Sequence, residues 1–148
     1  MDLANKVVNK MIGGDAFSKW LGIKILHISE GYCKLEMRIR EEMTNGFNIS
    51  HGGIAYSLAD SCLAFAANSY GKHAITIETK MNYLKKALNN EILIASSEKI
   101  KETGKHFESG KLSKYKIIIE NQDNDEIADF TGIVYHTGEM WFDKEKCN

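Results

Sequence analysis

The pattern of hydrophobic and polar positions divides the chain into helical and extended segments. Apolar side chains recur at helical spacing over residues 3–12, and a short second helix is expected around Phe17 and Trp20, so residues 1–20 form a helical segment. Apolar and charged residues alternate in "YCKLEMRIR", the period-two pattern of a strand with one face in water. "IKILHIS" before it supplies the first strand of a hairpin that turns at Glu30 and Gly31.

A long helix and four further strands follow in the pattern. Residues 54–69 are apolar on nearly every side, which predicts a core helix enclosed by its own sheet. "GKHFESGKL", residues 104–112, departs from the spacing of a phosphate-binding loop and is interpreted as a hairpin turn. The order of elements predicts an α+β fold in a single domain, residues 1–148. Four strands separated by turn-forming residues are expected at residues 73–84, 91–101, 111–121 and 126–136.

The long helix carries one acid among its apolar residues. Asp60 lies on a narrow polar stripe with Ser57, Ser61 and Asn68, because these residues share the spacing of one helix face. Two interpretations are open at this point. The stripe either meets water or places a carboxylate where it can act on a ligand.

The glycines before this helix favour the second interpretation. Gly52 and Gly53 follow His51 and leave backbone N–H groups unpaired at the positive end of the helix dipole. Such groups can stabilise an oxygen that becomes negative, and a nearby acid can activate water, which together suit acyl-transfer chemistry. Asp60 lies about 12 Å from Gly52 along the helix axis, so one chain cannot focus both on one carbon atom. A symmetric dimer could combine Gly52 of one chain with Asp60 of the other.

Composition narrows the class of protein. The chain has 148 residues, 43% of them hydrophobic, and its net charge of -1 provides no basic field for a nucleic-acid backbone. Charges interrupt the N-terminus where a signal peptide needs an apolar run, and no segment is apolar enough to span a bilayer, so a cytoplasmic protein without membrane partners is expected. Cys33, Cys62 and Cys147 are widely spaced, and neither they nor the histidines show metal-ligand spacing, so no metal site is expected.

The near-neutral net charge conceals an uneven distribution. Residues 72–116 contain 10 Lys and Arg against 5 Asp and Glu, whereas residues 117–148 contain 2 against 8. The basic segment is either a solvated face of strands or a surface for an anionic ligand. Lysines at strand ends and turns can reach phosphates as flexible point charges. Four lysines of this segment fall at such positions: Lys85, Lys86, Lys105 and Lys111.

The stretch "NGFNISHGGIAYSLAD", from Asn45 to Asp60, resembles the hotdog-fold acyl-CoA thioesterases of the PaaI-like, phenylacetic-acid-degradation type. That family has the pattern N-x-x-G-x-x-H-G-G followed by an acid, and the likeness extends over residues 17–138. The resemblance implies a hotdog fold, in which a curved antiparallel sheet wraps a long central helix, and a homodimer that pairs into a homotetramer. It also implies hydrolysis of acyl-CoA, with aryl groups such as (hydroxy)phenylacetyl among the substrates. Coenzyme A is then part of the substrate, and no separate cofactor is implied.

The resemblance assigns the central chemistry to three residues. The Gly52 N–H would polarise the thioester carbonyl, and Asn45 would help to hold that oxygen. Asp60 of the other protomer would activate water as a general base or attack as the nucleophile. For Asn45, a cap on its own loop remains an alternative.

Further residues receive supporting roles from the same resemblance. His51 would orient the loop or simply cap the helix, and Thr76 would position the water or serve as an ordinary strand threonine. Gly53 and the four lysines named above would contact the CoA part of the substrate.

Two positions depart from the family pattern. Asn48 stands where the family has glycine, and because asparagine tolerates left-handed backbone better than other non-glycine residues, the loop is expected to be preserved. Lys86 stands where the family has proline, which adds a second positive charge to "YLKKA".

An acyl-CoA hydrolase is favoured over two alternatives. A non-catalytic hotdog domain would bind acyl-CoA without turning it over, and a hotdog dehydratase would carry its histidine on a differently patterned loop. The joint presence of Asn45, His51, Gly52 and Asp60 favours the hydrolase.

Overall fold

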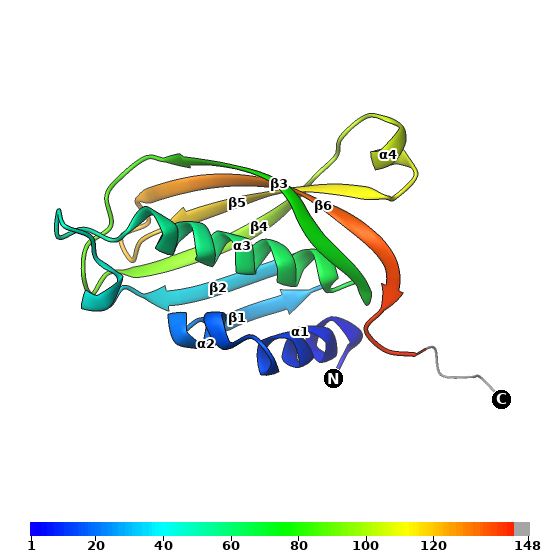
Figure 1. The fold of residues 1–148 in the computed structure, drawn as a ribbon, viewed down its shortest axis with the longest axis horizontal. Helices are drawn as coiled ribbons and strands as arrows, with labels where there is room; N and C mark the ends of the chain where they lie inside the picture. The colour runs from blue at the N-terminus through cyan, green and yellow to red at the C-terminus, as the bar shows by residue number, and fades with distance from the viewer. Residues whose placement is uncertain (144–148) are drawn as a thin grey trace.

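A six-stranded sheet wraps around one long helix in the computed structural model, which describes residues 1–143 (Figure 1). The strands lie in the order β1-β2-β4-β5-β6-β3, and each neighbouring pair is antiparallel. The strands are β1 (Lys24–Ser29), β2 (Tyr32–Arg38), β3 (Lys72–Tyr83), β4 (Ile92–Ile100), β5 (Leu112–Glu120) and β6 (Glu126–Met140). The helices are α1 (Leu3–Gly13), α2 (Ala16–Leu21), α3 (Gly52–Asn68) and α4 (Lys105–Glu108), with a 3-10 turn at Glu41–Met43.

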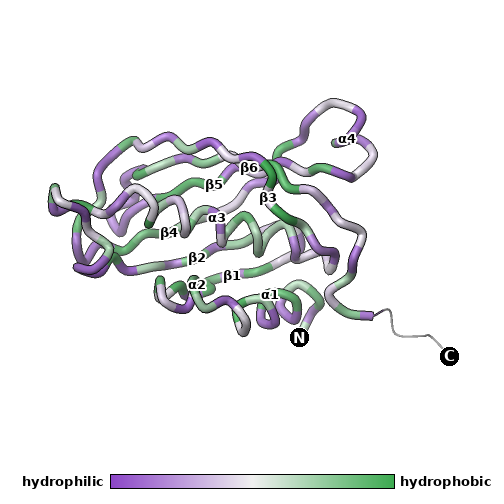
Figure 2. The backbone as a smooth tube through the Cα atoms, in the orientation of Figure 1, coloured by the Kyte–Doolittle hydropathy of each residue, from purple (hydrophilic) through white to green (hydrophobic). Residues whose placement is uncertain are grey.

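α3 forms the centre of the hydrophobic core. It packs against β2, β3, β4, β5 and β6, and its Leu58, Leu63 and Phe65 are almost completely buried. Burial of each such side chain contributes about 1.5–3 kcal/mol. Gly132 on β6 permits the close approach of the helix, because a side chain there would collide with Leu63. In Figure 2 hydrophobic positions lie along α3 and along the strands behind it, while the connecting loops are mainly hydrophilic.

The N-terminal helices cover the flank of α3 beside β1 (Figure 1). Both begin at an aspartate that caps the helix: Asp2 accepts a hydrogen bond from the Asn5 N–H, and Asp15 accepts one from the Ser18 N–H, each 2.9 Å long. Val7 and Val8 bury the apolar face of α1 that its spacing predicted. No helix within residues 1–143 is long and apolar enough to cross a membrane.

The sequence predicted the order of elements, and three details differ. Residues 104–112 lie in the hairpin connection between the antiparallel strands β4 and β5, as predicted, but they also form the one-turn helix α4. Four residues are too few to show a helical period, and α4 buries none of them. β6 continues to Met140, past the predicted end, because its polar last residues still pair with β3. Asn68 does not meet water but is buried and donates to the Ala74 carbonyl at 3.0 Å. Cys147 lies outside the described residues.

Candidate active site

The start of α3 is built around His51 and the two glycines that follow it. His51 is the N-cap, and its Nδ1 accepts a hydrogen bond of 3.0 Å from the Gly53 N–H. The turn is anchored on both sides, because the His51 N–H donates to the Met43 carbonyl and the Ser50 N–H donates to the Ala87 carbonyl, each at 2.8 Å. The imidazole and these backbone contacts therefore fix the conformation of the glycine turn.

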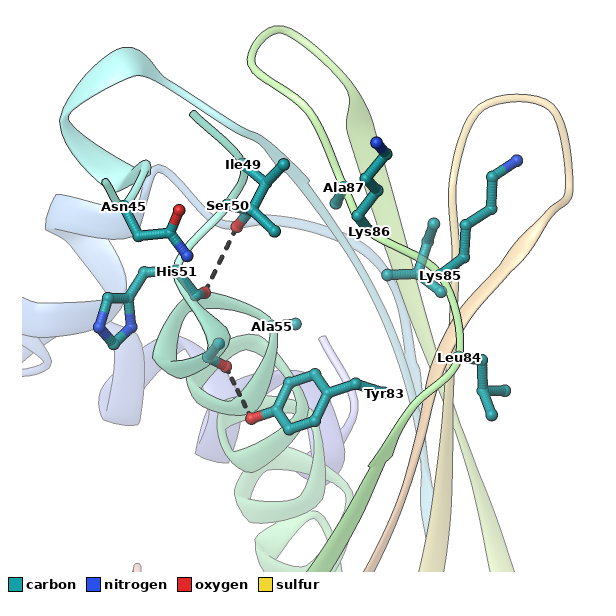
Figure 3. A pocket seen from close by; sticks show the side chains of 12 residues that line it. Asn45, Ile49, Ser50, His51, Ala55, Tyr83, Leu84, Lys85, Lys86 and Ala87 are labelled. Carbon is teal, nitrogen blue, oxygen red and sulfur yellow. Dashed lines mark hydrogen bonds between the residues drawn. The ribbon is translucent and has the colours of Figure 1, made fainter. Parts of the chain in front are cut away.

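Gly52 presents a free backbone donor at this turn. Its N–H has no acceptor within the part of the chain that the structure describes, and it lies at the positive end of a 17-residue helix. Its carbonyl accepts a hydrogen bond of 2.9 Å from the Tyr83 hydroxyl at the end of β3, as Figure 3 shows. Tyr83 thus holds Gly52 through its carbonyl, while the Gly52 N–H, which belongs to the preceding peptide, stays available to an anionic oxygen.

Asn45 lies in the loop that leads to the turn. Its N–H donates to the Ile49 carbonyl at 2.8 Å, and its Oδ1 accepts from the Phe47 N–H at 3.0 Å. Asn48 has a φ of 62°, so the residue that replaces the family's glycine adopts the left-handed conformation that asparagine tolerates. The loop closes on itself, and the Asn45 Nδ2 has no acceptor among residues 1–143.

A cavity of about 320 Å³ opens beside the glycine turn (Figure 3). Asn45, His51, Gly52 and Tyr83 line it together with Lys85 and Lys86 from the connection between β3 and β4. Lys85 is paired with Asp125 at 2.6 Å, and this hydrogen bond raises the pKa of Lys85. Lys86 is exposed and forms no ion pair within residues 1–143, so its charge is the freer of the two.

Asp60 lies in a second cavity of about 190 Å³, between α3 and the two N-terminal helices. The Thr76 hydroxyl on β3 donates to its Oδ1 at 3.3 Å. Burial raises the pKa of Asp60 above its usual value; the Thr76 hydrogen bond opposes this rise, and the negative charge of Asp15 adds to it. The carboxylate is therefore more basic than an exposed aspartate, which suits a group that accepts a proton.

Asp15 is a second acid near Asp60, and the sequence reasoning missed it. Its Oδ2 accepts a hydrogen bond of 2.6 Å from the Ser18 hydroxyl, which lies 2.8 Å from the hydroxyl of Ser61. This chain of hydroxyls reaches the residue next to Asp60. The sequence signal for Asp15 was its place as an N-cap before α2, but its proximity to Asp60 follows only from the packing of α2 on α3.

The structure divides the predicted site residues between two regions. The glycine-turn half-site consists of Asn45, His51, Gly52, Gly53, Lys85 and Lys86. The carboxylate half-site consists of Asp60 and Thr76. No residue lines both cavities. Both half-sites adjoin β3, since Thr76 lies within this strand and Tyr83 ends it.

Two of the predicted lysines lie outside both half-sites. Lys105 is exposed on α4, and Lys111 lines a third cavity near the start of β5. Tyr83 begins "YLKKA", but the sequence alone did not predict it as a site residue. Its role depends on where β3 ends relative to α3, which the sequence does not reveal. Within residues 1–143, no three His, Cys, Asp or Glu side chains gather as a metal-binding group requires.

Comparison with known proteins places this architecture in a family. Residues 47–108 match the family model described as the thioesterase superfamily. The chain is 32% identical to the acyl-coenzyme A thioesterase PaaI of Escherichia coli over 86% of this chain and 87% of that protein. It is 35% identical to a protein of Archaeoglobus fulgidus named as a candidate esterase, over 93% of this chain and 85% of the other.

The folds agree as well. The structure of the E. coli PaaI protein, from the phenylacetic acid degradation operon, superposes with a TM-score of 0.85 at 31% identity, covering 93% of this chain and 95% of that one. The long helix and curved antiparallel sheet are those of the hotdog fold, as the resemblance implied. The chain therefore belongs to the PaaI-like family of hotdog-fold thioesterases and is a thioester hydrolase.

Proposed function

We propose that the chain hydrolyses acyl-CoA thioesters to the free acid and CoA at a site shared by two protomers. The Gly52 N–H and Asn45 of one protomer hold the thioester carbonyl, and Asp60 of the other activates water. The observation that carries the proposal is the unpaired Gly52 N–H at the start of a long helix and beside a cavity, at a residue whose carbonyl is held by the Tyr83 hydroxyl. The 32% identical E. coli relative, an acyl-CoA thioesterase by name, supports the substrate class.

The chemistry follows from the two half-sites. Asp60 takes a proton from water, and the Thr76 hydroxyl beside it keeps the carboxylate and the water in position. The water oxygen bonds to the thioester carbon, and the negative charge that develops on the carbonyl oxygen is stabilised by the Gly52 N–H and the helix dipole. When the carbon–sulfur bond breaks, the CoA thiolate leaves and the proton on Asp60 returns to sulfur. Since a thiol has a pKa of about 8.5, this leaving group requires little acid assistance.

The sharing of the site rests on the free edge of β3. Within residues 1–143 this strand pairs only with β6, so one edge of its backbone is open there, and its Ile75 and Ile77 are 56% and 55% exposed. An unpaired edge of 12 residues with exposed isoleucines is a natural surface for a second copy. Because both half-sites adjoin β3, pairing of two β3 edges brings each half-site of one chain to the surface of the other. We propose this homodimer as the active unit and a dimer of dimers as the full assembly.

The acyl group is proposed to be an aryl-acyl group such as (hydroxy)phenylacetyl. Phe17, Tyr56 and Phe65 line the cavity that contains Asp60, and aromatic rings provide an apolar wall for a ring-bearing substrate. The origin of the E. coli structure, an operon for phenylacetic acid degradation, supports the same class. Five residues are assigned to the CoA part: Gly53, Lys85, Lys86, Lys105 and Lys111. The reaction needs no cofactor besides the CoA of the substrate, and a cytoplasmic location is proposed.

A test of this function removes the Gly52 N–H by substitution with proline, whose ring takes the place of the amide hydrogen. Gly52 is the first residue of α3, where proline is well tolerated, and His51 before it has a φ of -57° and ψ of 138°, which are compatible with a following proline. We expect Gly52→Pro to lower kcat for acyl-CoA hydrolysis by about 10²–10³-fold, the usual cost of an oxyanion donor. The matched control Gly52→Ala keeps the N–H, and its side chain would lie at an ordinary 3.4 Å from the Tyr83 hydroxyl.

The assay uses a panel of acyl-CoA esters with the wild type and both variants. Hydrolysis by the wild type and Gly52→Ala, with loss in Gly52→Pro, supports the proposal. Equal turnover by Gly52→Pro and Gly52→Ala would remove Gly52 from the mechanism. Tight binding of acyl-CoA by the wild type without turnover would instead identify a binding domain.

A further inference from the structure

Three side-chain hydrogen bonds join α3 to β3, which runs back along the helix (Figure 1). In order along the helix, the bonded pairs are Gly52 with Tyr83 at 2.9 Å, Tyr56 with Thr79 at 2.8 Å, and Asp60 with Thr76 at 3.3 Å. The first and the last of these pairs belong to the two half-sites. The middle pair has no place in the mechanism proposed above.

A shared site fixes where the two-fold axis of the dimer crosses α3. Gly52 of one protomer then lies opposite Asp60 of its partner, and the symmetry repeats the same contact in reverse. The midpoint of residues 52 and 60 is residue 56, so a shared site places the two copies of Tyr56 at the axis. At a rise of about 1.5 Å per residue, Tyr56 lies about 6 Å along the helix from both Gly52 and Asp60.

β3 gives the same position for the axis. The two residues of this strand that hold the half-sites are Thr76 and Tyr83, and their midpoint lies beside Thr79, the strand's member of the middle pair. Antiparallel pairing of two β3 edges about that point brings Thr76 opposite Tyr83 of the partner subunit. It also brings Ile75 opposite Leu84 of the partner subunit, so two exposed apolar side chains would cover each other.

Tyr56 is held firmly at one end of the cavity that contains Asp60. Its ring packs edge-on against Phe130 of β6, with the ring centres 5.4 Å apart, and its hydroxyl is fixed by Thr79. The cavity extends along α3 from Tyr56 past Asp60 to Phe65. Tyr56 therefore closes the end of the cavity that is nearer to the axis.

The two half-sites also define the direction in which a substrate lies. The cavity beside Gly52 extends away from Tyr56, because most of its lining residues precede α3 or follow β3. If the CoA part occupies that cavity and the carbonyl oxygen meets the Gly52 N–H, the acyl group lies on the opposite side, toward Tyr56 and the axis. The acyl groups of the two sites then approach the axis from opposite directions, and the two Tyr56 rings separate them.

We propose that Tyr56 is a specificity-determining residue for the acyl group, because its two copies form one end wall that bounds both acyl pockets of the dimer. This inference rests on the proposed function. Each pocket extends about 6 Å along the helix before it meets the wall, which suits a single ring or a short chain and excludes fused rings and long acyl chains. A substitution at Tyr56 changes both copies of the wall at once.

Substrate preference tests the size limit. The quantity measured is kcat/KM for acetyl-CoA, phenylacetyl-CoA and naphthylacetyl-CoA, with the wild type and three variants of Tyr56. We expect Tyr56→Ala to raise the ratio of naphthylacetyl-CoA to phenylacetyl-CoA at least about tenfold, because it opens the wall. Tyr56→Trp should lower the ratio of phenylacetyl-CoA to acetyl-CoA about tenfold, since the larger ring shortens the pocket. The matched control Tyr56→Phe keeps the ring and loses only the hydroxyl, so both ratios should stay within about twofold.

Photochemical cross-linking tests the position of Tyr56 without hydrolysis. The substitution Tyr56→p-benzoylphenylalanine keeps an aromatic ring at this position, and on irradiation its ketone reacts with C–H bonds that it contacts. We expect a covalent dimer in which both cross-linked peptides come from α3. The same amino acid in place of Phe107 on α4, in the connection between β4 and β5, should give no link to α3.

Two results would overturn the proposal. One is a folded, active Tyr56→Ala variant with the substrate ratios of the wild type, and the other is a set of cross-links confined to one chain. If Tyr56→Ala does not fold, Tyr56→Val provides a second truncation of the ring. A wild type that hydrolyses no acyl-CoA would contradict the proposed function instead. The size preference is then measured as dissociation constants of the same three esters, and the cross-link still decides whether the two copies of Tyr56 meet.

Discussion

Asp60 is ionisable but lies on a helix that is otherwise almost wholly apolar, and its environment explains how it can serve as a base. Burial raises its pKa, Thr76 donates a hydrogen bond that moderates the rise, and Asp15 contributes a like charge. Each of these influences comes from a different element: α3 itself, β3 and the start of α2. The basicity of the carboxylate is therefore adjustable by single substitutions that leave Asp60 in place.

Replacing Asp60 should abolish activity and stabilise the fold. Asp60→Asn removes the base, so we expect kcat to fall by at least about 10²-fold. Burial makes the pKa of Asp60 higher in the folded protein than in the unfolded chain, so its ionisation lowers the free energy of unfolding as the pH rises through the pKa of the folded state. Urea denaturation should thus show Asp60→Asn more stable than the wild type at pH 7, with the difference vanishing in acid. Near-normal turnover by the folded variant would contradict the role of Asp60.

Two substitutions should move the acidic limb of the pH–rate profile in opposite directions. Thr76→Ala removes the hydrogen bond that lowers the pKa of Asp60, so the rise of kcat/KM with pH should begin at higher pH. Asp15→Asn removes a like charge but keeps an oxygen that can cap α2, so the rise should begin at lower pH. Thr76→Ser, which keeps the hydroxyl, serves as the control. Profiles that coincide for all four proteins would show that Asp60 does not titrate in the rate-limiting step.

At the scale of elements, the connection between β3 and β4 contributes two neighbouring lysines whose charges are not equivalent. Lys85 is paired with Asp125 at 2.6 Å, whereas Lys86 has no such partner within residues 1–143. Both line the cavity at the glycine turn. Lys86 is therefore expected to attract a phosphate group more strongly than Lys85, whose charge is offset by Asp125.

Kinetics should distinguish the two lysines. We expect Lys86→Gln to raise KM for acyl-CoA at low salt with little change in kcat, because the nucleotide is bound alike in the ground and transition states. The effect of Lys85→Gln should be smaller, since Asp125 already offsets its charge. Both effects should fade with salt, and a short thioester without the nucleotide should be insensitive. An unchanged KM for Lys86→Gln at low salt would place the CoA phosphates elsewhere.

Helices and strands could be predicted from the sequence where one hydrophobic period extends along the whole element. β2 alternates apolar and charged residues and α3 is apolar over four turns, so both were predicted. α4 has a single turn and no buried face, and the end of β6 is polar on both sides, so neither carries a periodic signal. For the candidate site, the spacing of Asn45, Gly52 and Asp60 predicted the glycine turn and the acid, whose roles stay predictions, whereas the contacts of Tyr83 and Asp15 join elements distant in sequence.

At the scale of the whole molecule, the two half-sites of a single chain lie in separate cavities. The Gly52 N–H opens to one cavity and Asp60 to another, with no shared lining residue. The helix geometry had predicted this separation from the sequence, but the surface that brings two copies together could not be predicted. The candidate for this surface is the edge of β3, because the order of strands places β3 at the edge of the sheet.

The central claim, that Gly52 of one protomer works with Asp60 of its partner, is tested most directly by complementation. Gly52→Pro and Asp60→Asn chains carrying different affinity tags are co-expressed, and the heterodimer is isolated by two successive purifications. It contains one site in which both groups are intact, so we expect about half the wild-type activity, while each parental homodimer remains at least about 10²-fold below it. A heterodimer as inactive as its parents would show that both groups act within one chain and would contradict the shared site.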